Sequence, residues 1–180
     1  MPATFPTSYP APVATRPRPR LRGVAPSPAI GRDGTSSRTA RAALAHHLGH
    51  ADPLAGVDRT VPERTWERVG TADGAELWLI TWPPDSGTGW HDHGSASGAF
   101  VVLEGALTEH VWTGVATATT LPPHLVREFG SSHVHDVVNT GTGTAVSLHA
   151  YAPSLAAMTR YEVVRGRLQV TSVEQRGELW

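Results

Sequence analysis

Residues 90–109 read WHDHGSASGAFVVLEGALTE. His91 and His93 stand one residue apart at the start, and an apolar run leads from there to Glu104-Gly105. Alternate side chains of a β-strand face the same way, so the two imidazoles would project side by side into one space. The apolar run predicts a strand, and Glu104-Gly105 predicts a tight turn into the next one. The stretch therefore predicts a β-hairpin with a pair of candidate metal ligands at its entrance.

The rest of the chain from about Trp66 onward has the same character, because short β-type runs alternate with turn residues. These runs are residues 76–82, 97–105, 106–112, 114–121, 124–129, 133–139, 144–151, 161–166 and 168–174. So many short strands without a long helix among them predict an all-β fold, an antiparallel sandwich or barrel. A small barrel with an open mouth can hold one ligand or metal inside.

The N-terminal part of the chain is different in composition. Residues 1–37 are rich in Pro, Arg, Ser, Thr and Ala, and this composition predicts a disordered tail. Residues 38–49 contain good helix formers and end at a glycine, so we expect a short helix there. We therefore divide the chain into a tail, 1–37, and one folded domain, 38–180.

The bulk composition excludes several classes of partner. Fifteen basic and sixteen acidic residues nearly cancel, so no overall field points to nucleic acid or to an acidic membrane. There is no cysteine, which excludes disulfides, thiolate metal sites and a cysteine nucleophile. No apolar run reaches the roughly 18 to 20 residues of a membrane span, and the N-terminus lacks a secretory apolar segment. We expect a cytoplasmic monomer that acts on a small molecule.

A second histidine motif lies downstream. The stretch HVHDVVNTG places His135 four residues before Asn139 at the start of a β-run, and His133 is a second imidazole of the same parity. Either histidine could be a third ligand beside His91 and His93. A lone His-x-His also fits a solvated loop, but two such motifs that flank a hairpin are more specific.

The two motifs together look like those of a cupin, which implies a jelly-roll β-barrel. The first cupin motif usually continues to a Glu ligand and then to a glycine; here Gly105 matches the glycine and Gly98 stands in the Glu position. The stretch 90–109 resembles the bacterial cysteine dioxygenases, a thiol dioxygenase family whose ligand set lacks that carboxylate. The resemblance covers about residues 62–173 and implies His91, His93 and His135 as ligands of Fe(2+).

Animal members of that family carry a Cys at the position of Gly98, and it is crosslinked to the active-site tyrosine. A chain without cysteine cannot form this thioether. The difference argues against a crosslink and not against the activity, because bacterial members commonly have Gly there.

The stretch SLHAY supplies a polar row, Ser147, His149 and Tyr151, at alternate positions of one predicted strand. An inward polar row needs internal hydrogen bonds or ligand contacts. The resemblance implies a catalytic relay in which Ser147 orients His149 and His149 orients Tyr151, whose hydroxyl reaches the substrate. A solvent-facing polar stripe is the alternative.

A substrate carboxylate needs a cation, preferably a guanidinium. The stretch RTWERVG offers Arg64 and Arg68, and we choose Arg68 because an aromatic residue stands two positions before it, as in the family pattern. The resemblance further implies that an Arg at this place favours cysteine over 3-mercaptopropionate.

Three neutral imidazoles leave a divalent ion with its full charge, whereas the usual two-His-one-carboxylate set cancels one unit. Such an ion attracts a thiolate strongly. The residues alone favour neither iron nor zinc; the resemblance implies Fe(2+)- and O₂-dependent oxidation of L-cysteine to cysteine sulfinic acid, a step of cysteine catabolism. The alternatives are a dioxygenase of another small thiol such as 3-mercaptopropionate or cysteamine, a non-catalytic metal-binding cupin, and a zinc or nickel cupin with another activity.

Overall fold

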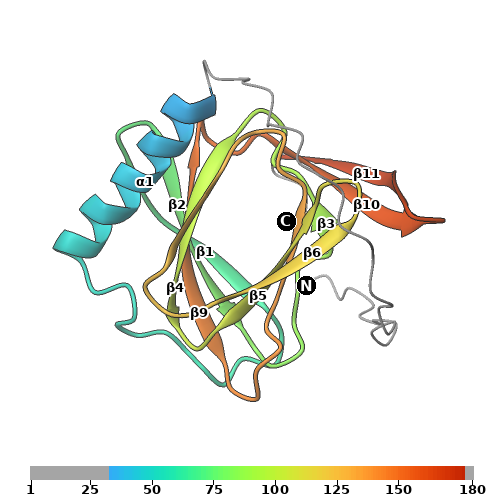
Figure 1. The fold of residues 1–180 in the computed structure, drawn as a ribbon. Coiled ribbons are helices and arrows are strands. Elements are labelled where there is room, and N and C mark those ends of the chain that lie inside the picture. The colour runs from blue at the N-terminus through green and yellow to red at the C-terminus, as the bar shows by residue number, and fades with distance from the viewer. Residues whose placement is uncertain (1–32, 177–180) are drawn as a thin grey trace, which may run out of the picture.

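The computed structural model describes residues 33–176 of the chain. Within this part, one helix is followed by eleven strands that form two facing antiparallel sheets (Figure 1). The first sheet has the order β1 (Thr65–Ala72), β2 (Ala75–Trp82), β9 (Ala145–Ala152), β4 (Ser97–Glu104), β7 (Val126–Phe129). The second has the order β11 (Arg167–Gln175), β10 (Ala157–Val164), β3 (Trp90–His91), β8 (His135–Val138), β5 (Leu107–Trp112), β6 (Ala116–Leu121). The predicted all-β jelly-roll barrel is confirmed.

Helix α1 (Asp33–His50) lies against the outer face of the five-stranded sheet (Figure 1). Its buried residues Ala40, Ala43 and Leu44 recur at the spacing that places them on one helical face. They pack in one cluster with side chains of β4 and β9, among them Val101 and Leu148. Of the described helices, none is long and apolar enough to cross a membrane.

The helix predicted for residues 38–49 is present and begins earlier than expected. It starts at Asp33, so residues 33–37, which we had assigned to the tail, belong to the helix instead. The remainder of the predicted tail, residues 1–32, lies outside the described residues.

Strand β9 is buried along its whole length because both of its faces are covered. Val146, Leu148 and Ala150 belong to the cluster under the helix, while the alternate residues face the interior between the two sheets. The strand lies between β2 and β4 in the middle of its sheet. A polar side chain at an inward position of β9 is therefore held in a regular, fully paired strand.

The predicted turn at Glu104-Gly105 connects β4 to β5, but the predicted hairpin is wrong, because β4 belongs to the five-stranded sheet and β5 to the six-stranded sheet and the two do not pair. Gly105 has φ +74°, a conformation that favours glycine. A Cβ there would also lie 2.9 Å from the Cβ of Ala145, so the turn requires glycine for two reasons.

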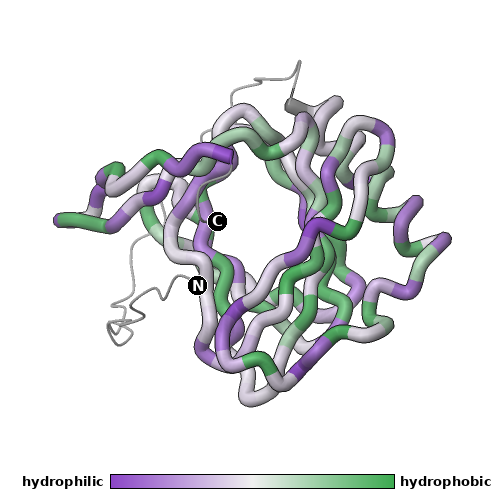
Figure 2. Tube along the Cα trace, turned by 180° about the vertical axis from the view of Figure 1, so that it is seen from behind, coloured by the Kyte–Doolittle hydropathy of each residue, from purple (hydrophilic) through white to green (hydrophobic). Residues whose placement is uncertain are grey.

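The strands β10 and β11 form a hairpin that extends away from the barrel, and hydrophobic and hydrophilic residues alternate along it (Figures 1 and 2). Strand β10 starts at Ala157, four residues before the predicted run 161–166. This early part matters for the site, because Arg160 and Tyr161 pair there with His91 and Trp90 of β3.

Candidate metal centre and its pocket

The three predicted ligand histidines converge in the interior. His91 is the last residue of β3 and pairs in register with His135, the first residue of β8. His93 follows in the loop after β3, and all three side chains are buried. One ring nitrogen of each can be chosen so that the three atoms all lie within 4.8 Å of one another. The geometry brings together the trio that the sequence predicted.

The loop between the first two histidines is held by Asp92, which faces the other way. Its Oδ1 accepts hydrogen bonds from the backbone N–H of Gly94 at 2.9 Å and of Thr159 at 3.2 Å. Its Oδ2 accepts one from the Tyr161 hydroxyl at 2.6 Å. Strand β3 has only two residues, so these bonds to β10, rather than a long strand, fix the positions of His91 and His93.

The ring nitrogens of the trio leave lone pairs for a cation. The Nδ1 of His91 donates to the Gly89 carbonyl at 2.9 Å, and the Nδ1 of His135 donates to Glu109 Oε1 at 2.9 Å. These bonds fix the tautomers that carry the lone pair on Nε2. Neither ring nitrogen of His93 has a hydrogen-bond partner among the described residues. Because buried polar groups are rarely left unpaired, this donor set fits a bound metal ion.

The electrostatics also suit metal ligation. Burial lowers the pKa of His91 and of His93 well below the usual value, and the neighbouring imidazoles lower it further. Burial likewise lowers the pKa of His135, although the hydrogen bond to Glu109 opposes the shift. All three rings are therefore neutral near pH 7, which is the form that binds a metal.

The predicted row on β9 is also assembled. Ser147 Oγ lies 2.8 Å from His149 Nε2, and the Tyr151 hydroxyl lies 3.3 Å from His149 Nδ1. Trp82 Nε1 donates to Ser147 Oγ at 2.8 Å, which adds one member to the row. Burial lowers the pKa of His149 to about 3 and raises the pKa of Tyr151, so both are neutral. The row faces the interior, and the solvent-facing alternative is wrong.

A pocket opens between the two sheets beside these groups. It is lined by His91, His135, His149, Tyr151, Arg64 and Arg160, with several tryptophans. The guanidinium of Arg64 lies 5.0 Å from the Trp66 ring and 5.3 Å from the Trp82 ring, within range of a cation–π contact. Arg160 is held by Glu174, its Nε lying 3.0 Å from both carboxylate oxygens. The pocket thus joins the histidines, the Tyr151 hydroxyl and two cations.

Arg68, which we had chosen as the carboxylate anchor, is not part of this pocket. Its side chain is 56% exposed and lies 3.6 Å from Glu76, at another part of the barrel wall. Arg64 and Arg68 flank Trp66 at the same parity, so the alternation of strand β1 could not choose between them. Four residues of strand separate them by about 13 Å, and only Arg64 reaches the pocket. Of the two arginines that the sequence offers, the structure places Arg64, and not Arg68, at the pocket.

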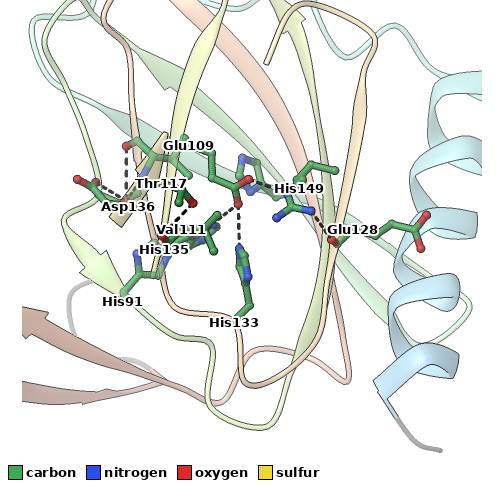
Figure 3. Close-up of polar contacts among 12 residues, drawn as sticks. His91, Glu109, Val111, Thr117, Glu128, His133, His135, Asp136 and His149 are labelled. Atoms are coloured by element: carbon green, nitrogen blue, oxygen red, sulfur yellow. Dashed lines mark hydrogen bonds and ion pairs between the residues drawn. The ribbon is translucent and has the colours of Figure 1, made fainter. Parts of the chain in front are cut away.

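A third polar group, which the sequence pattern did not reveal, lies behind His135. Glu109 is buried, and its Oε1 accepts hydrogen bonds from His135 Nδ1 and His133 Nε2, each at 2.9 Å (Figure 3). Its Oε2 accepts one from Arg127 Nε at 2.6 Å. Burial raises the pKa of Glu109, but the hydrogen bonds from the two histidines outweigh it and hold the pKa well below the usual value. Glu109 is therefore ionised.

A family model described as cysteine dioxygenase type I matches residues 54–164, more than half of the chain. The chain belongs to this family. The matched range contains every histidine of the trio, the row on β9 and Arg64.

Solved structures agree with the fold of this cysteine dioxygenase family member. One from Thermus thermophilus is 18% identical, with a TM-score of 0.51 over 58% of this chain and 96% of that one. A Klebsiella pneumoniae protein with a double-stranded β-helix domain is 18% identical, with a TM-score of 0.52 over 60% of this chain and 87% of its own. At such identities the likeness shows the fold alone.

The family member has no space for a side chain at position 98. A Cβ on Gly98 would overlap the ring of Phe129 and lie 3.0 Å from the carbonyl oxygen of Ala150. The Phe129 ring itself packs against His93, with ring centroids 4.8 Å apart. The carboxylate that the first cupin motif usually carries is therefore absent in sequence and excluded by packing.

Glu109 and Trp82 were missed as members of the site for different reasons. Leu107, Glu109 and Val111 share one parity on β5, so a charge in that row was a readable sign of a buried carboxylate. Trp82 gave no such sign, because a tryptophan beside a proline pair fits simple packing equally well.

Proposed function

We propose that this family member is a thiol dioxygenase that uses Fe(2+) and O₂, and that its substrate is L-cysteine, which becomes cysteine sulfinic acid. The family membership supports dioxygenase chemistry. The single observation that carries the rest is that two of the three clustered neutral imidazoles, His91 and His135, line one pocket together with a tyrosine hydroxyl and an arginine.

The metal would be held by His91, His93 and His135. A ferrous ion there would supply the redox chemistry by which both atoms of O₂ are added to the sulfur of a thiol. Because none of the three ligands is charged, the site retains the full positive charge that attracts a thiolate. Zinc could hold a thiolate in such a site but could not activate O₂.

The row on β9 controls the hydrogen of the Tyr151 hydroxyl. Trp82 can only donate, so Ser147 accepts its bond and has its own hydrogen for His149 Nε2. His149 then carries its proton on Nδ1 and donates to the Tyr151 oxygen. The hydrogen of Tyr151 is left to point into the pocket, where it can bond to the substrate.

Arg64 is the group that we propose for the substrate carboxylate. It lines the pocket, its guanidinium lies over the rings of Trp66 and Trp82, and a guanidinium can bind a carboxylate through two parallel N–H bonds. Arg160 is the second cation in the pocket, but Glu174 already occupies its Nε. A cation at this place favours a thiol with a carboxylate over cysteamine.

The test is anaerobic loading with Fe(2+), followed by addition of O₂ and one of three thiols: cysteine, 3-mercaptopropionate or cysteamine. We expect O₂ uptake to be highest with cysteine, and the product mass to increase by two oxygen atoms. A preference for 3-mercaptopropionate would contradict cysteine as the substrate but would support the proposed dioxygenase reaction. No O₂ uptake with any thiol by iron-loaded protein would contradict the proposal and favour a metal-binding cupin without catalysis.

The partners follow from this proposal. A small thiol and O₂ are the only ones it requires, and we propose that the protein works as a monomer in the cytoplasm without nucleic acid or membrane. Size-exclusion chromatography with light scattering would test the monomer directly.

A further inference from the structure

Glu109 has no role in the proposed dioxygenase chemistry or in the hydrogen-bonded row on β9. It lies on β5 with its side chain 1% exposed, one hydrogen bond away from a candidate metal ligand. Removing a carboxylate from water costs several kcal/mol unless its oxygens are paired. The two histidines and Arg127 supply that pairing. The buried charge of Glu109 therefore carries a desolvation cost, which suggests that it has a function at this position.

The three candidate ligands differ in what stands behind them. His91 is backed by a neutral carbonyl, that of Gly89. His93 has no hydrogen-bond partner among the described residues. Only His135 is backed by a carboxylate, with 2.9 Å between its Nδ1 and Glu109 Oε1 (Figure 3). A carboxylate behind an imidazole fixes the tautomer and makes the other ring nitrogen a stronger donor to a metal.

We propose that Glu109 is a positioning residue that acts through His135. It holds His135 Nε2 toward His91 and His93. It also supplies a negative charge on the far side of the His135 ring from the metal, which the three neutral ligands themselves lack. Gly98 leaves no room for a carboxylate against the metal, so the charge is placed behind an imidazole instead. This inference rests on the proposed function only in that a divalent metal binds the three histidines.

His133 and Arg127 are supports of this carboxylate in our interpretation. His133 is 12% exposed, its ring stacks on Phe129 at 5.2 Å between centroids, and its Nε2 donates to the oxygen that His135 also uses. Arg127 is 36% exposed and bonds the other oxygen. Together they prevent Glu109 from turning away from His135.

The test compares metal affinity in variants of the full chain. Glu109→Gln removes the charge but keeps the shape and an oxygen for His135. The amide nitrogen would face Arg127, so the double variant Glu109→Gln/Arg127→Gln removes that conflict. The control is Glu104→Gln, because Glu104 also bonds an arginine, Arg59, through both oxygens but is 38% exposed at the end of β4.

Affinity would be measured with Co²⁺ in competition with a chelator, and folding would be checked by circular dichroism. We expect one Co²⁺ per chain and binding weaker by about 10- to 100-fold in both Glu109 variants, with the control unchanged. In iron-loaded protein we also expect a higher Fe(III)/Fe(II) reduction potential in both variants, because a negative charge near the metal stabilises the ferric state. A structural role alone would not require that shift.

Each other outcome has a definite meaning. Wild-type affinity and potential in the double variant would overturn the role of Glu109 while leaving the proposed function intact. No Co²⁺ binding by the wild-type chain would refute the three-histidine site and, with it, both proposals. Two Co²⁺ per chain, one of them lost in His133→Ala, would overturn the inference by giving Glu109 and His133 a metal of their own.

Discussion

The six-stranded sheet supplies His91 and His135 from strands of two and four residues, whereas the five-stranded sheet supplies Ser147, His149 and Tyr151 from one strand of eight. The short strands depend on the carboxylate side chains of Asp92 and Glu109. Asp92 ties the loop of the first histidines to β10, and Glu109 backs His135. The long strand uses neutral donors and acceptors only.

This difference shows how the side chains on each side of the pocket are held in position. Side chains on the long strand β9 are ordered by continuous pairing to β2 and β4, so short bonds within the row suffice. Side chains at the ends of short strands lack such support and need strong, charge-assisted bonds to hold them. Changes of charge should therefore affect the ligand side, and changes of hydrogen-bond direction should affect the row.

The largest effect that we expect is on the ligand side. His93→Ala removes a proposed ligand whose ring nitrogens have no hydrogen-bond partner among the described residues. Metal affinity should therefore fall by more than the about 10- to 100-fold expected when a group behind a ligand is changed. Metal content after gel filtration would measure it. The control is His110→Ala, on the outer face of β5 against Trp90. Retention of iron by the His93 variant would show that the trio is not the ligand set.

The next effect concerns the row on β9. Tyr151→Phe keeps the ring but removes the hydroxyl 3.3 Å from His149 Nδ1, so turnover should fall by about 100-fold or more while iron content stays normal. Steady-state O₂ uptake beside an iron assay separates the two. If iron were lost along with activity, the two sides of the pocket would be coupled and the comparison would break down.

The role of Arg64 at the pocket can be separated from that of Arg68, which lies four residues further along the chain. Arg64→Met should raise KM for cysteine by about 10- to 100-fold, since a hydrogen bond between charged groups contributes about 1.5–3 kcal/mol. It should leave cysteamine oxidation little changed, because that thiol has no carboxylate. Arg68→Met is the matched control and should change neither, as Arg68 lies outside the pocket. Equal losses on both thiols would remove Arg64 as the anchor.

A smaller effect concerns pH and the metal-free protein. The pKa of His149 is about 3 in the folded chain and about 6.5 unfolded, so between these values the unfolded chain binds the extra proton. The free energy of unfolding should therefore fall as pH falls below about 6.5, by up to about 1.4 kcal/mol per pH unit from this residue.

Urea titrations at pH 7 and pH 5 would measure that dependence. His149→Gln should have a shallower decrease than the wild-type chain, because one buried imidazole is gone. Identical slopes would mean that His149 is not the neutral, buried group that the row requires.

The fold and the metal centre were readable because they depend on local patterns. Alternation located most of the strands, and the spacing of His91, His93 and His135 together with the resemblance to a known family selected the trio. Ser147, His149 and Tyr151 were readable for the same reason, since three alternate residues of one strand must share a face.

The features of the site that the sequence did not predict depend on contacts between distant parts of the chain. Arg64 and Arg68 have equal parity, and only the position of β1 relative to the pocket separates them. Trp82 joins the row through a contact across 65 residues of sequence. The burial of Glu109 was readable from its parity on β5, but its contact with His135 depends on β8 lying beside β5, a pairing that no local pattern specifies.

The ring of Phe129 has one more consequence. With no sulfhydryl anywhere in the chain and an aromatic side chain filling the place beside Gly98, nothing at this centre has to be made by oxidation after synthesis. No thioether to Tyr151 can form, so freshly folded protein and protein that has been incubated with iron and O₂ should both run as a single band.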